Sequence, residues 1–115
     1  MTLEFSHLGQ KDKYEIYFSR LYDPQGKPLA EYLLFLDVNK KVMTSFARSH
    51  ERRNGHASEM IKKTVAELEK LVQQAGPFEH QVEFTNEGKR LKGLFLELGY
   101  IISGNKLMKK YAKKI

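Results

Sequence analysis

The loop around Gly55 brings together groups that proteins use to bind a phosphate or another anion. It contains Arg52 and Arg53 and lies between a predicted strand and the start of a long predicted helix. The first amide groups of a helix have no partner inside it and carry a partial positive charge. Glycine lets a phosphate approach the backbone closely, and arginine donates paired hydrogen bonds to phosphate oxygens. The loop therefore predicts a phosphate site, and an ordinary helix start with two solvated arginines fits the same residues.

Few other residues indicate a particular chemistry. The glycine spacing matches neither the P-loop nor the dinucleotide-binding motif. The absence of cysteine excludes disulfides, thiolate metal sites and cysteine nucleophiles. His50 and His56 lack a matching ligand set, so no metal site is predicted. No catalytic residue stands out. The candidates for a general base, each explained better by a solvated loop or strand position, are His50, Glu51, His56, His80 and Glu83.

Three strands lead into this loop. Aromatic and β-branched residues predict strands at 14–22, 29–38 and 42–48, joined by short polar turns. Continuous apolar residues at 33–36 indicate that the middle strand has apolar neighbours on both faces. The 13 residues before the first of these strands are enough for one short strand, near 3–7. The first part of the chain is thus predicted to be an antiparallel meander.

After the loop, the apolar pattern changes to that of a helix. Apolar residues at three- and four-residue steps predict an amphipathic helix from 57 to about 75. Residues 78–85 alternate as in a strand with one solvated face, and Asn86 can cap a second helix that ends at Gly99. A last hairpin is predicted at 100–111. We therefore expect one α+β domain over residues 1–115, with a mixed, mostly antiparallel sheet and two main helices packed on it.

The net charge of +6 does not by itself indicate nucleic-acid binding. Five of the positive charges are lysines in the basic end at residues 106–115, so residues 1–105 carry a net charge of +1. A nucleic-acid site would need a basic surface shared with the body of the domain. The chain has no apolar run of 18 residues and no apolar segment behind a basic start, so neither a membrane span nor a secretory signal is expected. A cytoplasmic protein fits these features.

The loop and the segment after the second helix also resemble a known family. Arg52, Gly55 and Ala57 have the spacing Arg/Gln-x-x-Gly-x-Gly/Ala, which is the signature of the GNAT superfamily of N-acetyltransferases. Residues 98–100 (Leu-Gly-Tyr) match a Leu-Gly-Phe/Tyr landmark of that family, and the predicted order of elements fits it over residues 14–111. By this resemblance the chain is identified as a short member of the superfamily.

The resemblance implies that the chain binds acetyl-CoA as a cosubstrate. In the family, backbone amides of the signature loop hold the pyrophosphate, and the edge of the preceding strand holds the pantetheine arm. Here that edge lies at Ser45 and Ala47, and a backbone N–H near Ala47 would polarise the thioester carbonyl. An amine then attacks directly, without a covalent enzyme intermediate. The cofactor-binding residues implied by the resemblance are Ser45, Phe46, Ala47, Arg52, Arg53, Asn54, Gly55, His56, Ala57, Ser58 and Phe95.

Two departures from the family bear on activity. Phe95 aligns with the tyrosine that protonates the leaving thiolate in many members, and a phenyl ring has no proton to donate. A thiol with a pKa near 8.5 can leave as a thiolate without an acid, so the loss should slow the reaction and not forbid it. The residues before residue 14 are also too few for the helix pair that usually walls the acceptor site. The acceptor side is therefore expected to be open or to be completed by a second copy of the chain, as in a homodimer.

These observations predict an acetyl-CoA-dependent N-acetyltransferase that acts on a primary amine of a small molecule or a protein. The alternative is a CoA-binding or protein-interaction module of the same fold with little or no catalysis, which Phe95 and the lack of an obvious base favour. A nucleic-acid-associated protein that uses the lysine-rich end is the third and least favoured interpretation.

Overall fold

The computed structural model describes residues 1–50, 55–83 and 86–113, and for residues 86–90 it describes the backbone only. These residues form, in order, β1 (Thr2–Lys11), β2 (Tyr14–Tyr22), β3 (Pro28–Asp37), β4 (Val42–Ser49), α1 (His56–Ala75), β5 (Phe78–Glu83), α2 (Asn86–Glu97), β6 (Ile101–Ser103) and β7 (Lys106–Tyr111). The strands make one sheet in the order β1-β2-β3-β4-β5-β7-β6. Its neighbouring strands are antiparallel except for β4 and β5, which are parallel. The predicted α+β fold is confirmed.

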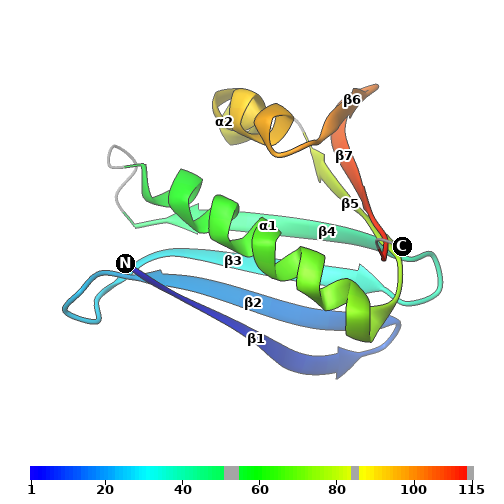
Figure 1. Cartoon of the computed structure of the whole chain (residues 1–115), viewed down its shortest axis with the longest axis horizontal. Coiled ribbons are helices and arrows are strands. Elements are labelled where there is room, and N and C mark those ends of the chain that lie inside the picture. Colours follow the sequence, from blue (N-terminus) through cyan, green and yellow to red (C-terminus); the bar gives the residue numbers. More distant parts are fainter. Residues whose placement is uncertain (51–54, 84–85, 114–115) are drawn as a thin grey trace.

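Helix α1 covers one face of the sheet over strands β1–β4 (Figure 1). Its apolar stripe, predicted from the sequence, is buried together with alternate residues of the strands, such as Leu21 and Leu34. The Thr64 hydroxyl donates to the Ser19 hydroxyl at 3.0 Å, and both side chains are fully buried between helix and sheet. The apolar helix residues buried in this layer are Met60, Ile61, Val65, Leu68, Leu71 and Val72.

The opposite face of β3 is less buried than the sequence predicts. Leu34 and Leu36 point toward α1 and are buried, whereas Phe35 on the other face is half-buried. The ring of Phe35 contacts Tyr14 and Phe46 edge-on, and Phe46 is 69% exposed. The continuous apolar run of β3 therefore reflects one face packed under a helix and one face covered in part by aromatic side chains of the neighbouring strands.

Strands β1 and β2 form a tight hairpin. A turn at residues 12–13 joins them, and Asp12 adopts a positive φ of 54° there. β1 spans 10 residues, so it is longer than the strand predicted near 3–7. The register with β2 shifts between His7 and Gly9. Within residues 1–22, all of which the structure describes, no helix lies between the two strands.

The C-terminal part adds α2 and a hairpin beyond β5. β5 ends at Glu83, and residues 84–85, which the sequence assigns to the same strand, lie outside the described residues. α2 begins at Asn86, so Asn86 is its first residue and not the cap before it that the sequence predicts. Gly99 follows the helix, and its φ of 93° suits a glycine in that place. β6 and β7 form the predicted hairpin around Gly104. Neither of the described helices has the length and hydrophobicity that crossing a bilayer requires.

Candidate active site

Strands β4 and β5 separate shortly after they pair. Two parallel pairs join them, Val42 with Glu79 and Met43 with His80. Beyond these pairs β4 continues along β3 to Ser49, while β5 turns away from it (Figure 1). One edge of β4 therefore has no strand partner from residue 44 onward, as far as the described residues show. We call this gap the β4–β5 opening.

The backbone groups of Ser45 and Ala47 face the β4–β5 opening. The N–H of Glu79 donates to the carbonyl oxygen of Lys41 at 2.9 Å, so this carbonyl points toward β5, and near the other end of β4 the N–H of His50 donates toward β3, to the Leu29 carbonyl. Backbone groups alternate in direction along a strand, so Met43, Ser45 and Ala47 direct theirs to the same edge. Unpaired N–H and C=O groups on a strand edge can bind an extended amide chain as another strand would. Ser45 and Ala47 are the residues that the sequence resemblance placed against the pantetheine arm.

The start of α1 presents free amide groups. Gly55 is the N-cap, with φ 67° and ψ 14° in the left-handed region, and no described side chain caps the helix. Its carbonyl oxygen accepts the N–H of Glu59 at 3.1 Å, so the earlier N–H groups have no partner within the helix. A Cβ at Gly55 would meet no atom within 4 Å, so the positive φ explains the glycine better than a lack of space does. The predicted site residues Arg52, Arg53 and Asn54 lie outside the described residues.

The first turn of α1 contains the predicted residues His56, Ala57 and Ser58. His56 is 9% exposed, and its Nδ1 atom is buried without a hydrogen-bond partner in the described structure. Buried polar groups are nearly always paired, so this nitrogen is an exception among the described residues. The helix start therefore has amide donors with no partner inside the helix, as an anion site needs, and one buried nitrogen that no described residue partners.

A chain of hydrogen bonds runs through the closed end of the β4–β5 opening, where Met43 pairs with His80; we call this end the apex. Ser45 Oγ lies 2.7 Å from His80 Nε2, and His80 Nδ1 lies 2.6 Å from the Tyr100 hydroxyl. That hydroxyl lies 2.7 Å from the Tyr111 hydroxyl, and Ser45 Oγ lies 3.0 Å from the Tyr32 hydroxyl. We call these five residues the His80 network. It connects β3 and β4 on one side of the opening to β5 and β7 on the other.

The His80 network is uncharged near neutral pH. His80 is fully buried, and burial lowers the pKa of its imidazole to about 3. Burial raises the pKa of Tyr32 to about 12. Burial is also the main reason why the pKa values of Tyr100 and Tyr111 are raised. A neutral imidazole has one donor and one acceptor nitrogen, and each nitrogen has one partner here. The network is therefore a chain of oriented dipoles that carries no net charge.

Phe95 packs against the His80 network from α2. It is 2% exposed, and its ring meets that of Tyr100 edge-on, with 5.0 Å between ring centres. The backbone N–H of Tyr100 donates to the Phe95 carbonyl at 2.9 Å. The position where the resemblance implies a proton donor thus holds an apolar ring that supports Tyr100. A contact between Phe95 and a cofactor stays a prediction.

The remaining candidate residues are scattered. Phe46 is exposed on the face of the sheet that points away from α1. His50 forms an ion pair of 3.6 Å with a glutamate of β3, and Glu83 is exposed. Glu51 lies outside the described residues. Of the base candidates that the structure describes, His80 is the one at the apex of the β4–β5 opening, and no cluster of three or more His, Asp or Glu side chains suited to a metal occurs in the described part.

The three tyrosines of the His80 network were not predicted as site residues. Their apolar surroundings in the sequence indicate core positions, and they do lie in the core. The signal that could have pointed to them is His80, which alternates with Phe78 and Val82 on the apolar side of the predicted strand. A histidine buried in a sheet needs polar partners for its ring nitrogens, and aromatic hydroxyls are partners that a core can supply.

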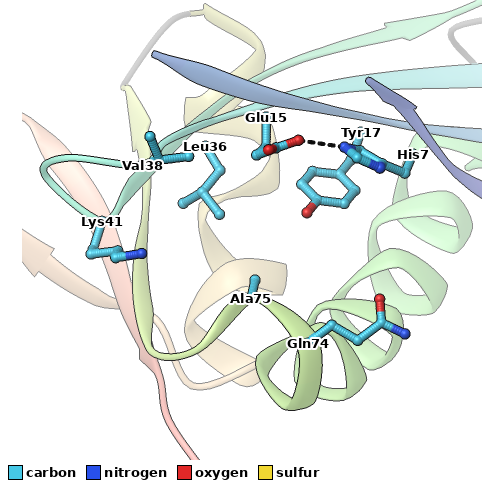
Figure 2. A pocket seen from close by; sticks show the side chains of 8 residues that line it. All are labelled: His7, Glu15, Tyr17, Leu36, Val38, Lys41, Gln74 and Ala75. Carbon is cyan, nitrogen blue, oxygen red and sulfur yellow. Dashed lines mark hydrogen bonds and ion pairs between the residues drawn. The ribbon is translucent and has the colours of Figure 1, made fainter. Parts of the chain in front are cut away.

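A separate pocket of about 300 Å³ lies between the C-terminal end of α1 and the sheet (Figure 2). His7 pairs with Glu15 at its rim, and the hydroxyl of Tyr17 points into the hollow. The 20 residues of α1 place this end about 30 Å from Gly55. The pocket is therefore remote from the free amides at the start of α1. Its lining consists of His7, Glu15, Tyr17, Leu36, Val38, Lys41, Gln74 and Ala75.

Several solved acetyltransferases have a similar fold. The GNAT-superfamily phosphinothricin acetyltransferase of Sinorhizobium meliloti, solved with acetyl-CoA, has a TM-score of 0.66 at 9% identity, over 84% of this chain and 62% of that protein. Spermidine N-acetyltransferase of Vibrio cholerae, solved with CoA and spermine, has a TM-score of 0.62 at 11% identity, over 83% and 63%. The Tetrahymena protein GCN5 has a TM-score of 0.59 at 10% identity, over 87% and 71%.

These similarities establish the fold and leave the activity open. The chain spans less than two thirds of the length of the first two proteins. The Vibrio cholerae enzyme has also been solved as a dodecamer. No protein-family model matches the sequence, and no curated protein matches it either.

Proposed function

Because the chain has the fold of the GNAT superfamily, we propose that it binds acetyl-CoA and transfers the acetyl group to an amine. Two observations carry this proposal together: the β4–β5 opening, and the start of α1 at Gly55, which no described side chain caps. The opening offers a free strand edge to an extended thioester arm, and the helix start offers amide donors to a pyrophosphate. Proteins of this fold have been solved with acetyl-CoA or CoA bound, which supports the same cosubstrate here.

The free edge of β4 holds the pantetheine arm in this proposal. The arm carries amide groups, which pair with strand N–H and C=O groups as a neighbouring strand would. Ser45 and Ala47 offer such groups at the edge where β5 has turned away. The N–H of Ala47 is then available to the thioester carbonyl oxygen, where negative charge develops as the amine attacks.

The start of α1 holds the pyrophosphate. The N–H groups of His56, Ala57 and Ser58 precede the first intrahelical hydrogen bond, which runs from Glu59 to Gly55. The helix dipole adds a favourable term of about 0.3–1 kcal/mol for each anionic group. The buried Nδ1 of His56, which has no partner in the described residues, belongs to the same first turn.

The reaction is a direct transfer. An amine in its neutral form attacks the thioester carbonyl carbon, so that a C–N bond forms and the C–S bond breaks. The electron pair of the broken bond stays on sulfur, and the proton lost by nitrogen passes to solvent. Phe95 has no proton to give to the sulfur, so the thiolate leaves without the acid that the family tyrosine would supply.

We place the acceptor amine on the face of the opening that lacks a helical wall. The β1–β2 turn at residues 12–13 leaves no helix between these strands, and Phe46 beside the opening is 69% exposed. An open side of this kind suits an amine carried by a large molecule, such as a protein side chain. A second copy of the chain that covers this side would instead suit a small amine.

A module of the same fold that binds CoA without catalysis is the second candidate. Two observations favour it: the buried apolar ring at Phe95, and the low pKa of His80, which stays neutral and does not act as an acid near neutral pH. Thiol release in the presence of amines distinguishes the two candidates. Turnover with any amine, peptide or polyamine supports the enzyme, whereas tight binding of acetyl-CoA without turnover supports the module.

Thermal unfolding with and without acetyl-CoA tests the shared part of both candidates. At a ligand concentration 100 times the dissociation constant, binding adds about 2.7 kcal/mol to the free energy of unfolding. Free CoA should compete, and ATP at the same concentration serves as a control that shares the phosphates and lacks the pantetheine arm. No shift at millimolar acetyl-CoA would overturn both candidates.

A further inference from the structure

Ser45 is the one member of the His80 network that is not fully buried. Tyr32, His80, Tyr100 and Tyr111 are each at most 3% exposed, whereas Ser45 has intermediate exposure. Ser45 also lies two residues beyond Met43, the last residue of β4 that pairs with β5. The network therefore runs through the core and reaches the β4–β5 opening at the Ser45 hydroxyl.

The hydrogen bonds leave the Ser45 hydrogen free to change partner. When Nε2 of the neutral imidazole carries the proton, it donates to Ser45 Oγ at 2.7 Å, and Nδ1 accepts from Tyr100. Ser45 then donates its own hydrogen to the Tyr32 hydroxyl, across the longer distance of 3.0 Å. If that hydrogen turns to a stronger acceptor, the Tyr32 hydroxyl can donate to Ser45 Oγ instead. The exchange leaves no buried group of the network without a partner.

The thiol end of a bound CoA lies closest to this hydroxyl, if acetyl-CoA binds as proposed above. The arm enters from the start of α1, beyond Ser49 at the end of β4, and runs along the free edge toward the closed apex at Met43 and His80. In free CoA the sulfur is the part that penetrates deepest, and in acetyl-CoA only the acetyl group lies beyond it. Ser45 is the first residue beyond Met43 whose backbone groups face the opening. Its side chain also ends in a hydroxyl, which can donate a hydrogen bond.

We propose that Ser45 Oγ donates a hydrogen bond to the sulfur of the leaving CoA thiolate, in place of the hydroxyl that Phe95 lacks. His80 is a positioning residue in this proposal, since its Nε2 holds and polarises the Ser45 hydroxyl. The C–S bond breaks with its electron pair on sulfur, and CoA leaves as the thiolate. Ser45 keeps its proton throughout, so the step needs no acid.

The neutral state of the network fits a donor of this kind. Burial lowers the pKa of His80 to about 3, so the imidazole is neutral at higher pH. The thiolate therefore has no imidazolium cation to bind in place of the Ser45 hydroxyl. Among the described residues, Lys109 places a cation against the network. Its Nζ lies 5.0 Å from the centre of the Tyr111 ring and donates to the Leu98 carbonyl at 2.7 Å and to Glu69 at 3.4 Å. Lys109 thus sits at the far end of the network from Ser45.

The ionisation of the thiol in bound CoA tests the proposal without relying on turnover. The ultraviolet absorbance of the thiolate is titrated in the complex of CoA with wild type, Ser45→Ala and Ser45→Thr. A hydrogen bond to a charged sulfur should lower the titration midpoint by about one pH unit. We expect Ser45→Ala to lose this shift and Ser45→Thr, which keeps the hydroxyl, to retain it. Thr44→Val is the matched control, because it removes an exposed hydroxyl from the neighbouring position of β4.

A second pair of variants tests the role of His80. His80→Leu removes the donor to Ser45, and His80→Gln offers an amide N–H near the position of Nε2. We expect His80→Leu to lose the thiol shift and His80→Gln to keep part of it, and this pair carries the test if Ser45→Ala does not fold. Equal thiol midpoints in wild type, Ser45→Ala and His80→Leu with CoA bound to each would overturn the proposal. Failure of the wild type to bind CoA would instead overturn the proposed function on which it rests.

Discussion

The Nδ1 atom of His80 lies 2.6 Å from the hydroxyl oxygen of Tyr100, and both side chains are buried. The other ring nitrogen lies 2.7 Å from Ser45 Oγ at the edge of β4. One imidazole thus connects the core beside the C-terminal hairpin to the strand edge where the proposed cosubstrate binds. Stability and ligand chemistry should therefore both respond to changes in this network.

His80 should make the protein less stable in acid. Burial lowers its pKa to about 3 from the ordinary value of 6.5 that it has when unfolded. Between these values the unfolded state binds more protons, so the free energy of unfolding falls as the pH falls, by at most about 1.4 kcal/mol per pH unit. Above pH 6.5 His80 is neutral in both the folded and the unfolded state, so the protein loses no stability through its protonation there. Urea unfolding at a series of pH values measures this slope, and His80→Gln should lose most of it; identical slopes in both proteins would contradict the assignment.

Tyr100→Phe should destabilise the fold. It keeps the ring that packs on Phe95 but leaves His80 Nδ1 and the Tyr111 hydroxyl without their partner. Each unpaired buried group costs about 1–3 kcal/mol. Tyr22→Phe is the control, because the Tyr22 hydroxyl makes only long contacts of 3.4 Å near the surface, and we expect it to cost less than about 0.5 kcal/mol. Chemical denaturation that gives equal losses for the two variants would show that the network contributes little to stability.

Gly55→Asp should abolish binding of acetyl-CoA. Aspartate tolerates the left-handed conformation better than most residues, and its charge repels a pyrophosphate at the helix start. Gly104→Asp is a matched control: Gly104 has φ 60° in the β6–β7 turn, Gly55 has φ 67°, and a Cβ added at either position would meet no atom within 4 Å. Calorimetric titration should show tight binding only in the control. Retained binding by Gly55→Asp would place the phosphates elsewhere.

Phe95→Tyr should rescue Ser45→Ala. If Ser45 donates to the thiolate because Phe95 cannot, a hydroxyl restored at position 95 should replace the lost hydrogen bond, which is worth about tenfold or more in rate. The double variant should therefore turn over faster than Ser45→Ala alone. Phe95→Tyr on its own should gain much less. Rates that change by the same factor in both backgrounds would show that the two positions act independently.

The sequence predicts the parts of the fold that depend on local patterns. The spacing of Met60, Ile61, Thr64 and Val65 predicts α1, and Gly55 marks its start, where the structure has a positive φ. The prediction for β1 is too short, because the exposed polar residues of this strand lack the alternation that marks a strand. The apolar run in β3 predicts two buried faces, whereas only the face under α1 is fully buried. The sequence alone does not show which face of a strand a helix will cover.

The His80 network could not be predicted, because it depends on register between distant segments. Ser45 and His80 are 35 residues apart, and their contact follows from the parallel pairing of Met43 with His80. That pairing is set by how α1 packs and returns the chain to the sheet. Tyr100 joins them from the other side of α2. What the sequence does contain is a histidine on the apolar side of a strand, which indicates a buried polar site without naming its partners.

The most direct test of the central claim is a crystal structure of the chain with acetyl-CoA. We expect the pantetheine amides to pair with the backbone of Ser45 and Ala47 in the β4–β5 opening, and the pyrophosphate to contact the N–H groups of His56 to Ser58. The sulfur should then lie within hydrogen-bond distance of Ser45 Oγ. Acetyl-CoA bound at another place, or an opening that stays empty at a saturating concentration of acetyl-CoA, would contradict the proposed function.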